Sequence, residues 1–253
     1  LANRDLIYLG VSGDGDSASI GFGQFAHALR RGVNMAYIVE NNGVYGLTKG
    51  QFSATADRGS KSKRGVTNTD NSIDLAAIAL QLGASFVARS FSGDKQQLVP
   101  IIKAAIAHKG AAFIDVISPC VAFNNHAGST KSFDFVREHN EAVNRLDFMA
   151  SRMPIEVQYE PGTVEVVEQH DGSKLALRKL AADYEITDRT AALGFLQHHA
   201  KKGQIVTGLL YVEPDSEDLH AHLRTIDRPL NELGETELCP GQAALENFNA
   251  SLR

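Results

Sequence analysis

The chain has 253 residues, of which 43% are hydrophobic and 22% charged, a composition typical of a folded globular protein rather than a disordered one. The formal net charge is −5 and no basic stripe is present, which argues against nucleic acid as a partner. We expect no membrane span and a reducing, cytoplasmic location, because the apolar runs are short, no signal peptide is visible, and two cysteines cannot form a disulfide framework.

Strand and helix patterns alternate through the first 120 residues. Short apolar, β-branched runs predict buried strands at 5–12, 34–40, 84–89 and 112–117. Helical patterns are found at 18–31, 74–82 and 95–108, with Ser17 or Ser19 and Ser72 as expected N-caps. Pro100 favours a start of the third helix near itself. This alternation predicts an α/β fold with a parallel sheet that is covered on both faces.

The stretch 51–70 is polar and rich in Ser, Thr, Lys, Arg and Gly, so we expect a long surface loop there. After residue 120 the pattern changes. Helices are expected at 135–152, 191–202, 217–224 and 242–252, a strand at 204–213, and a hairpin formed by 164–170 and 174–177 around Asp171-Gly172. We therefore expect an α/β domain over residues 1–135 and a C-terminal α+β extension over 136–253, packed on that domain or on a partner.

Two motifs follow consecutive strands of the predicted sheet. Gly13-Asp14-Gly15 comes after the first strand, and Asn41-Asn42 comes after the second, with 25 residues between the motifs. A Gly-Asp-Gly turn alone is weak evidence, since these residues are common in turns. The two motifs together are stronger evidence, because ligands of open α/β sheets bind at the carboxyl ends of the strands.

The chemistry of these motifs fits a diphosphate bound through a metal ion. Asp14 provides a carboxylate oxygen, Asn42 an amide oxygen, and Val44 a backbone carbonyl, and Mg²⁺ prefers such oxygen ligands. The glycines permit close approach of the backbone to the diphosphate. The amino end of the following helix also favours an anion.

This arrangement resembles the thiamine-diphosphate motif, in which Asp14, Asn42 and the Val44 carbonyl correspond to the Mg²⁺ ligands. Three blocks resemble those of 2-oxoacid:ferredoxin oxidoreductases: GDGDSASIG at 13–21, NGVYGLTKGQ at 42–51, and SPCVAFN at 118–124. The late LCPG at 238–241 and the layout of the tail resemble the β subunit of the 2-oxoglutarate type. The resemblance implies a thiamine-diphosphate-binding fold whose diphosphate-binding module lies in residues 1–135.

The resemblance also implies which residues bind the cofactor and the substrate. Thr48 is expected to bond the diphosphate, and Leu47 and Lys49 are expected to line the substrate pocket as catalytic-site residues. The full set of implied cofactor-binding residues is Gly13, Asp14, Gly15, Asp16, Asn42, Tyr45, Gly46, Leu47 and Thr48. Lys49 would pair with the distal carboxylate of 2-oxoglutarate, which pyruvate lacks. A solvated loop lysine is the alternative interpretation, and pyruvate or a branched 2-oxoacid stays open as the substrate.

Cys120 resembles one of four thiolate ligands of a [4Fe–4S] cluster. The other three ligands of the family's pattern would precede Gly13, and the given sequence does not contain them. The implied reaction is the reversible, coenzyme-A-dependent oxidative decarboxylation of a 2-oxoacid, with electrons passed to ferredoxin. No carboxylate that could activate the aminopyrimidine is evident, which implies an α subunit as partner. Three alternatives remain: a non-redox thiamine-diphosphate decarboxylase, a Mg²⁺-dependent phosphate-binding module similar to a response regulator, and an inert partner-binding fragment.

Overall fold

The computed structural model describes residues 6–45, 51–60, 66–118, 155–168, 174–239 and 241–252. Contacts divide the chain into a large unit, Tyr8–Leu219, and a small unit that contains His220–Arg253. The expected helix at 135–152, the turn at Asp171-Gly172 and Cys120 all lie outside the described residues.

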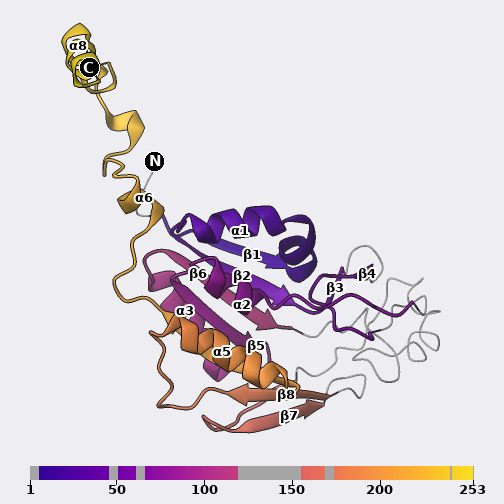
Figure 1. Cartoon of the computed structure of the whole chain (residues 1–253). Coiled ribbons are helices and arrows are strands. Elements are labelled where there is room, and N and C mark those ends of the chain that lie inside the picture. The colour runs from indigo at the N-terminus through magenta and orange to yellow at the C-terminus, as the bar shows by residue number, and fades with distance from the viewer. Residues whose placement is uncertain are drawn as a thin grey trace, which may run out of the picture. The chain divides into compact units, whose positions relative to one another are not determined.

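The large unit contains a seven-stranded sheet with the order β1-β2-β6-β5-β9-β8-β7 (Figure 1). The strands are β1 (Leu9–Gly13), β2 (Met35–Asn41), β5 (Phe86–Phe91), β6 (Ala111–Ile117), β7 (Val164–Glu168), β8 (Lys174–Lys179) and β9 (Gln204–Val212). The first four in sheet order run parallel to one another, as the sequence predicts. Strand β9 is antiparallel to β5, and β7 and β8 form the expected antiparallel pair.

Helices cover both faces of this sheet. On one face, α1 (Phe22–Arg30), α2 (Leu75–Gln81) and α5 (Arg189–Ala200) pack in a core that includes Phe113. On the other face, α3 (Lys95–Ala107) buries Ile101 and Ala105, which lie one turn apart on a single side of the helix. Strand β5 is buried along its whole length, as a central strand of a doubly covered sheet must be. The predicted fold class is confirmed.

Three local expectations about helix starts are wrong. A π-helical turn at Asp16–Ile20 precedes α1, so neither Ser17 nor Ser19 caps that helix. Asp74 caps α2 in place of Ser72, and its carboxylate accepts the Ala77 N–H at 2.9 Å. Helix α3 begins at Lys95 because Asp94 caps it, although Pro100 then removes the helical hydrogen bond to the carbonyl of residue 96.

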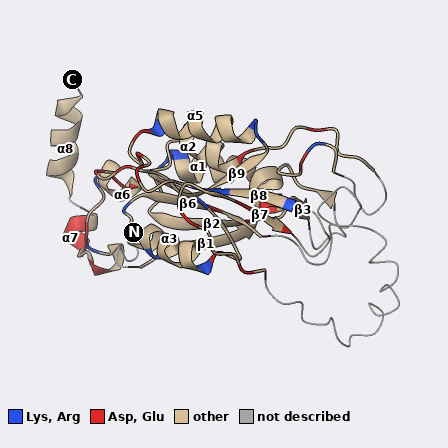
Figure 2. Cartoon of the chain, turned by 90° about the horizontal axis from the view of Figure 1, so that it is seen from below, with Lys and Arg blue, Asp and Glu red and all other residues tan. Residues whose placement is uncertain are grey.

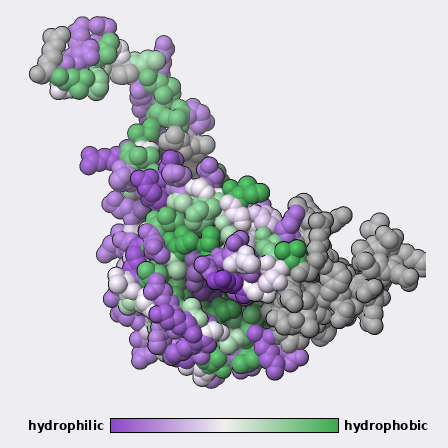
Figure 3. Space-filling model, turned by 45° about the vertical axis from the view of Figure 1, so that its right-hand side comes forward, coloured by the Kyte–Doolittle hydropathy of each residue, from purple (hydrophilic) through white to green (hydrophobic). Residues whose placement is uncertain are grey.

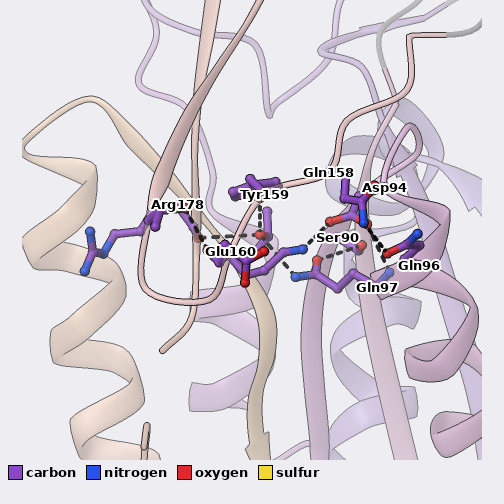
Figure 4. A network of polar contacts seen from close by, with 11 residues as sticks. Ser90, Asp94, Gln96, Gln97, Gln158, Tyr159, Glu160 and Arg178 are labelled. Carbon is purple, nitrogen blue, oxygen red and sulfur yellow. Dashed lines mark hydrogen bonds and ion pairs between the residues drawn. The ribbon is translucent and has the colours of Figure 1, made fainter. Parts of the chain in front are cut away.

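A polar network joins the segment after residue 155 to β9 and to the start of α3 (Figure 4). The hydroxyl of Tyr159 lies 2.7 Å from that of Thr207 on β9, and burial raises the pKa of Tyr159 to about 12. The Lys179 ammonium lies 2.8 Å from a carboxylate oxygen of Asp94 and 4.4 Å from the centre of the Tyr159 ring. Strands β7–β9 thus extend the parallel sheet. The predicted boundary at residue 135 lies outside the described residues, so the division into 1–135 and 136–253 stays a prediction.

The tail after Leu219 consists of short helices: α6 (Leu219–His222), the 3₁₀ turn η2 (Leu230–Glu232), α7 (Glu235–Leu238) and α8 (Gln242–Ser251). The helix expected at 217–224 is therefore only four residues long. Helix α7 is acidic (Figure 2), and Arg228 pairs with Glu237 at 2.8 Å. Apolar side chains such as Phe248 are exposed along the tail (Figure 3). No helix within the described ranges is long and apolar enough to cross a membrane.

Candidate functional site

The site begins at Asp14, which directly follows β1 and is completely buried. One carboxylate oxygen, Oδ2, accepts the Gly43 N–H at 2.9 Å and the Ser53 hydroxyl at 2.5 Å, and also accepts the Thr55 hydroxyl. The other oxygen, Oδ1, is buried without a hydrogen-bond partner among the described residues. A buried anionic oxygen without a donor is costly, so this arrangement fits a cation such as Mg²⁺ at Oδ1.

The second motif meets Asp14 through the turn that follows β2. Gly43 adopts a positive φ of 76°, which only glycine takes readily, and this conformation aims its N–H at Asp14. The Asn42 side-chain oxygen accepts the Val44 N–H at 3.1 Å. Val44 then pairs with Phe52 in the short hairpin β3 (Val44–Tyr45) and β4 (Gln51–Phe52). The expected meeting of the two motifs is confirmed.

Glycine is also required where Tyr45 lies against the first motif. A Cβ atom on Gly15 would lie 2.7 Å from a ring carbon of Tyr45, closer than real contacts allow. A Cβ on Gly13 would meet no heavy atom within 4 Å, so space is open beside the backbone there. Asp16 is exposed at the start of the π-helical turn. The open space at Gly13 suits a ligand that approaches the backbone closely.

The expectation of a surface loop over 51–70 is wrong for Ser53, Thr55 and Asn68, which are buried. Hydrogen bonds to two other segments hold the turn that contains Ser53 and Thr55. The Ala54 N–H donates to the Ser19 hydroxyl at 3.1 Å, and the Ser72 hydroxyl donates to the Thr55 carbonyl at 2.8 Å. Hydrophobic periodicity could not have found this packing, because the buried groups are hydroxyls and an amide that carry no apolar signal.

Known proteins share sequence similarity with this chain. Residues 1–116 match the family described as the C-terminal TPP-binding domain of thiamine pyrophosphate enzymes. The chain is 46% identical over 156 residues to a 2-oxoacid:ferredoxin oxidoreductase subunit beta of Sulfolobus sp. This alignment covers 61% of the present chain and 49% of the Sulfolobus protein. It is 35% identical over 155 residues to the 2-oxoglutarate synthase subunit KorB of Methanocaldococcus jannaschii, covering 59% and 57% of the two chains.

A solved structure agrees with these relatives. The fold matches a 2-oxoglutarate:ferredoxin oxidoreductase of Magnetococcus marinus, solved with 2-oxoglutarate, coenzyme A and succinyl-CoA bound. The TM-score is 0.63 at 26% identity, and the match covers 90% of this chain and 65% of the other.

The chain is thus similar to the β subunits of the 2-oxoacid:ferredoxin oxidoreductases. It spans about half the length of the first curated relatives. The resemblance read from the sequence and the thiamine-diphosphate-binding fold are therefore confirmed.

Several residues that the β-subunit resemblance implies cannot be placed. Gly46, Leu47, Thr48 and Lys49, together with the cluster cysteine Cys120, lie outside the described residues. The second cysteine, Cys239, is exposed in the tail. No group of three or more metal-binding side chains occurs within the described ranges. The roles of these five residues stay predictions.

The structure adds a charged cluster that the sequence reasoning missed. Arg89 on β5 donates to Asp115 on β6 at 2.8 Å and to Asp74 at 2.5 Å, and Asn41 donates to the other oxygen of Asp115 at 3.0 Å. Burial raises the pKa of Asp115, whereas the two carboxylates raise the pKa of Arg89 in spite of its burial. The signal was an arginine and an aspartate within the apolar runs of two central strands.

This cluster lines a cavity of about 590 Å³ at the same edge of the sheet as the two motifs. Asn42, Gly43 and Thr55 line the cavity on the motif side. Residues 174–176 of β8 and 204–206 of β9 also contribute to the wall. The motif turn and the charged cluster therefore line the same cavity.

Proposed function

We propose that this chain is the thiamine-diphosphate-binding part of a β subunit that catalyses the coenzyme-A-dependent oxidative decarboxylation of 2-oxoglutarate. The products are succinyl-CoA, CO₂ and reduced ferredoxin, and the reaction is reversible. The observation that carries the proposal is the buried Asp14, whose free oxygen lies where the two cofactor motifs meet. The relatives and the solved structure supply the reaction class.

The residues of this chain would hold the cofactor in the following way. Asp14 Oδ1, the Asn42 side-chain oxygen and the Val44 carbonyl would bind Mg²⁺, which in turn binds the diphosphate. Gly13 leaves room for the diphosphate beside the backbone. Gly15, Asp16, Tyr45, Gly46, Leu47 and Thr48 complete the proposed set. When bound, thiamine diphosphate supplies the carbon nucleophile and the electron sink for decarboxylation. The chain's own contribution is to fix the cofactor's position against the substrate.

The choice of 2-oxoglutarate rests on Lys49 and on the relatives. A lysine in the pocket favours a substrate with a second carboxylate and penalises one that leaves the ammonium unpaired. The similar proteins named 2-oxoglutarate synthase and 2-oxoglutarate:ferredoxin oxidoreductase support this choice. Leu47 would pack against the carbon chain of the substrate.

The proposal includes a [4Fe–4S] cluster with Cys120 as one ligand and a cytoplasmic location. Such a cluster takes four thiolates, whereas the given sequence has two cysteines, so the proposal requires ligands from elsewhere. The proposed partners are an α subunit, which would provide the activating carboxylate, and ferredoxin as the electron acceptor. The name subunit beta of the relatives supports an α partner.

The test is an anaerobic assay of the intact subunit with its α subunit. Coenzyme-A-dependent viologen reduction is measured with 2-oxoglutarate and with pyruvate, each with and without thiamine diphosphate and Mg²⁺. Faster turnover of 2-oxoglutarate that requires the cofactor supports the proposal. A preference for pyruvate contradicts the role of Lys49 and leaves the reaction class standing, and no reduction with either acid contradicts the class itself.

A further inference from the structure

We propose that Ser53 and Thr55 are positioning residues that hold the Asp14 carboxylate in the orientation that a divalent cation requires. This inference rests on the proposed function, because it assumes that Asp14 binds Mg²⁺. It concerns two residues that lie outside both cofactor motifs and whose side chains contact only one of the two Asp14 oxygens.

The hydrogen-bond geometry distinguishes the two oxygens of Asp14. Oδ2 receives one backbone N–H and two hydroxyls, whereas Oδ1 has no partner among the described residues. A carboxylate can rotate about its Cβ–Cγ bond and exchange its oxygens. With three donors fixed around one oxygen position, any intermediate orientation breaks charge-assisted bonds, so the other oxygen stays directed toward the cation position.

The protons of the two hydroxyls are accounted for in this arrangement. Each hydroxyl has one proton to donate, and the acceptor Oδ2 lies within reach of both. The Thr55 N–H donates to the Ser53 hydroxyl oxygen at 3.2 Å, which favours directing the Ser53 proton toward Asp14. The 2.8 Å approach of the two hydroxyl oxygens then follows from their common acceptor.

The turn that carries these hydroxyls is fixed independently of Asp14. The Ser53 N–H donates to the Gly43 carbonyl at 3.1 Å, and the Asn68 amide donates to the Ala56 carbonyl at 3.0 Å. Both hydroxyl residues are buried, with exposed fractions of 5% and 9%. Groups that hydrogen-bond to a metal-binding carboxylate provide a rigid, water-excluded support of this kind.

The experiment measures Mg²⁺ binding rather than turnover. The intact subunit in complex with its α subunit is freed of metal, saturated with thiamine diphosphate and titrated with Mg²⁺ by calorimetry. Thr55→Val removes the hydroxyl with little change of shape. We expect it to weaken Mg²⁺ binding about 10- to 100-fold, the range typical of residues that hydrogen-bond to a metal ligand. Ser53→Ala, a second variant in case the first does not fold, is expected to act in the same direction. Thr55→Ser keeps a hydroxyl at this position and should keep most of the wild-type Mg²⁺ affinity.

The matched control is Thr207→Val, which removes another buried threonine hydroxyl, one that contacts Tyr159 instead of Asp14. It should lower the unfolding temperature and leave the Mg²⁺ affinity unchanged. Unchanged affinity in both Thr55→Val and Ser53→Ala would overturn the inference and leave the proposed function intact. Equal losses in Thr55→Val and Thr55→Ser would also overturn it, because the hydroxyl would not be the cause. A wild-type enzyme that binds neither Mg²⁺ nor thiamine diphosphate would instead overturn the proposed function.

Discussion

Two completely buried aspartates, one within a strand of the sheet and one directly after another strand, have opposite kinds of partners. Asp115 on β6 has a partner on each oxygen, and one partner is the guanidinium of Arg89. Asp14 after β1 has three neutral donors on one oxygen and none on the other, and it forms no ion pair with a described residue. Within the described ranges, Arg89 neutralises the first carboxylate, whereas no cationic side chain neutralises the second.

This difference distinguishes a carboxylate that stabilises the fold from one that binds a ligand. A buried charge that is paired internally contributes to the folded state, and removal of its partner damages that state. A buried charge with an orphaned oxygen needs a cation from outside, so removal of the charge affects binding more than folding. The comparison therefore predicts that variants at the two aspartates fail in different assays.

The largest effect is expected for Arg89→Ala. The change leaves the Asp115 carboxylate buried without a cation, and a loss of this kind destabilises proteins by about 3–5 kcal/mol. Urea unfolding of the metal-free subunit measures the free energy of unfolding directly.

The control for Arg89→Ala is Lys95→Ala. Lys95 pairs with Glu156 at 2.8 Å, but both side chains are more than half exposed, so its loss should leave stability nearly unchanged. If Arg89→Ala is no less stable than Lys95→Ala, Asp115 does not depend on the guanidinium and the comparison fails.

The next effect is expected for Asp14→Asn. The asparagine oxygen can take over the three donors, but its amide nitrogen then occupies the place of Oδ1 and cannot bind a cation. We expect the Mg²⁺ affinity to fall more than about 100-fold, which is more than the loss expected when only a hydrogen bond to Asp14 is removed. The metal-free variant should be as stable as the wild type or more so, because an unpaired buried charge has been removed.

Calorimetric titration with Mg²⁺ and urea unfolding in a chelator give these two quantities separately. Retained Mg²⁺ affinity would show that Asp14 is not a metal ligand. A loss of several kcal/mol in the metal-free state would show instead that Asp14, like Asp115, is a structural charge.

The sequence predicts one of these two regions and misses the other. Asp14 is predictable because Gly13, Gly15 and Asn42 form a local motif after strands whose apolar runs are clear. Arg89 and Asp115 belong to different strands, and their pairing depends on β5 and β6 lying side by side in the sheet. Residues 84–89 and 112–117 give no sign that these two side chains face each other. Such a contact is tertiary, and local patterns do not encode it.

The fold shows the same limit. Apolar periodicity predicts the parallel strands and their covering helices to within a few residues, since those patterns are set by burial. The buried turn at Ser53 and Thr55 escapes prediction because its polar residues are satisfied by Asp14, which lies about forty positions earlier in the chain. The cap of α2 is likewise Asp74 rather than Ser72, because Ser72 is engaged by the Thr55 carbonyl of that turn.

The smallest effect is expected for Asp74→Asn, which tests the outer carboxylate of the Arg89 cluster. Burial acts to raise the pKa of Asp74, but the Arg89 guanidinium and the N–H donors of α2 outweigh it, so the pKa lies below its ordinary value of 3.8. A depressed folded pKa stabilises the protein above the unfolded value and loses that contribution as the pH falls through the folded value. The side chain is 38% exposed, so the contribution should not exceed about 1 kcal/mol.

Asparagine keeps the cap on α2, so Asp74→Asn removes the charge alone, whereas Asp74→Ala removes both the charge and the cap. Above about pH 4, Asp74→Asn should be less stable than the wild type, and the two should converge as the pH falls further. Asp74→Ala should be about 1 kcal/mol less stable than Asp74→Asn at every pH, because it lacks the cap as well. Urea unfolding from neutral pH to about pH 3 measures both differences. A difference in the free energy of unfolding between Asp74→Asn and the wild type that does not change with pH would mean that Asp115 alone neutralises Arg89. The charged cluster would then consist of a single ion pair.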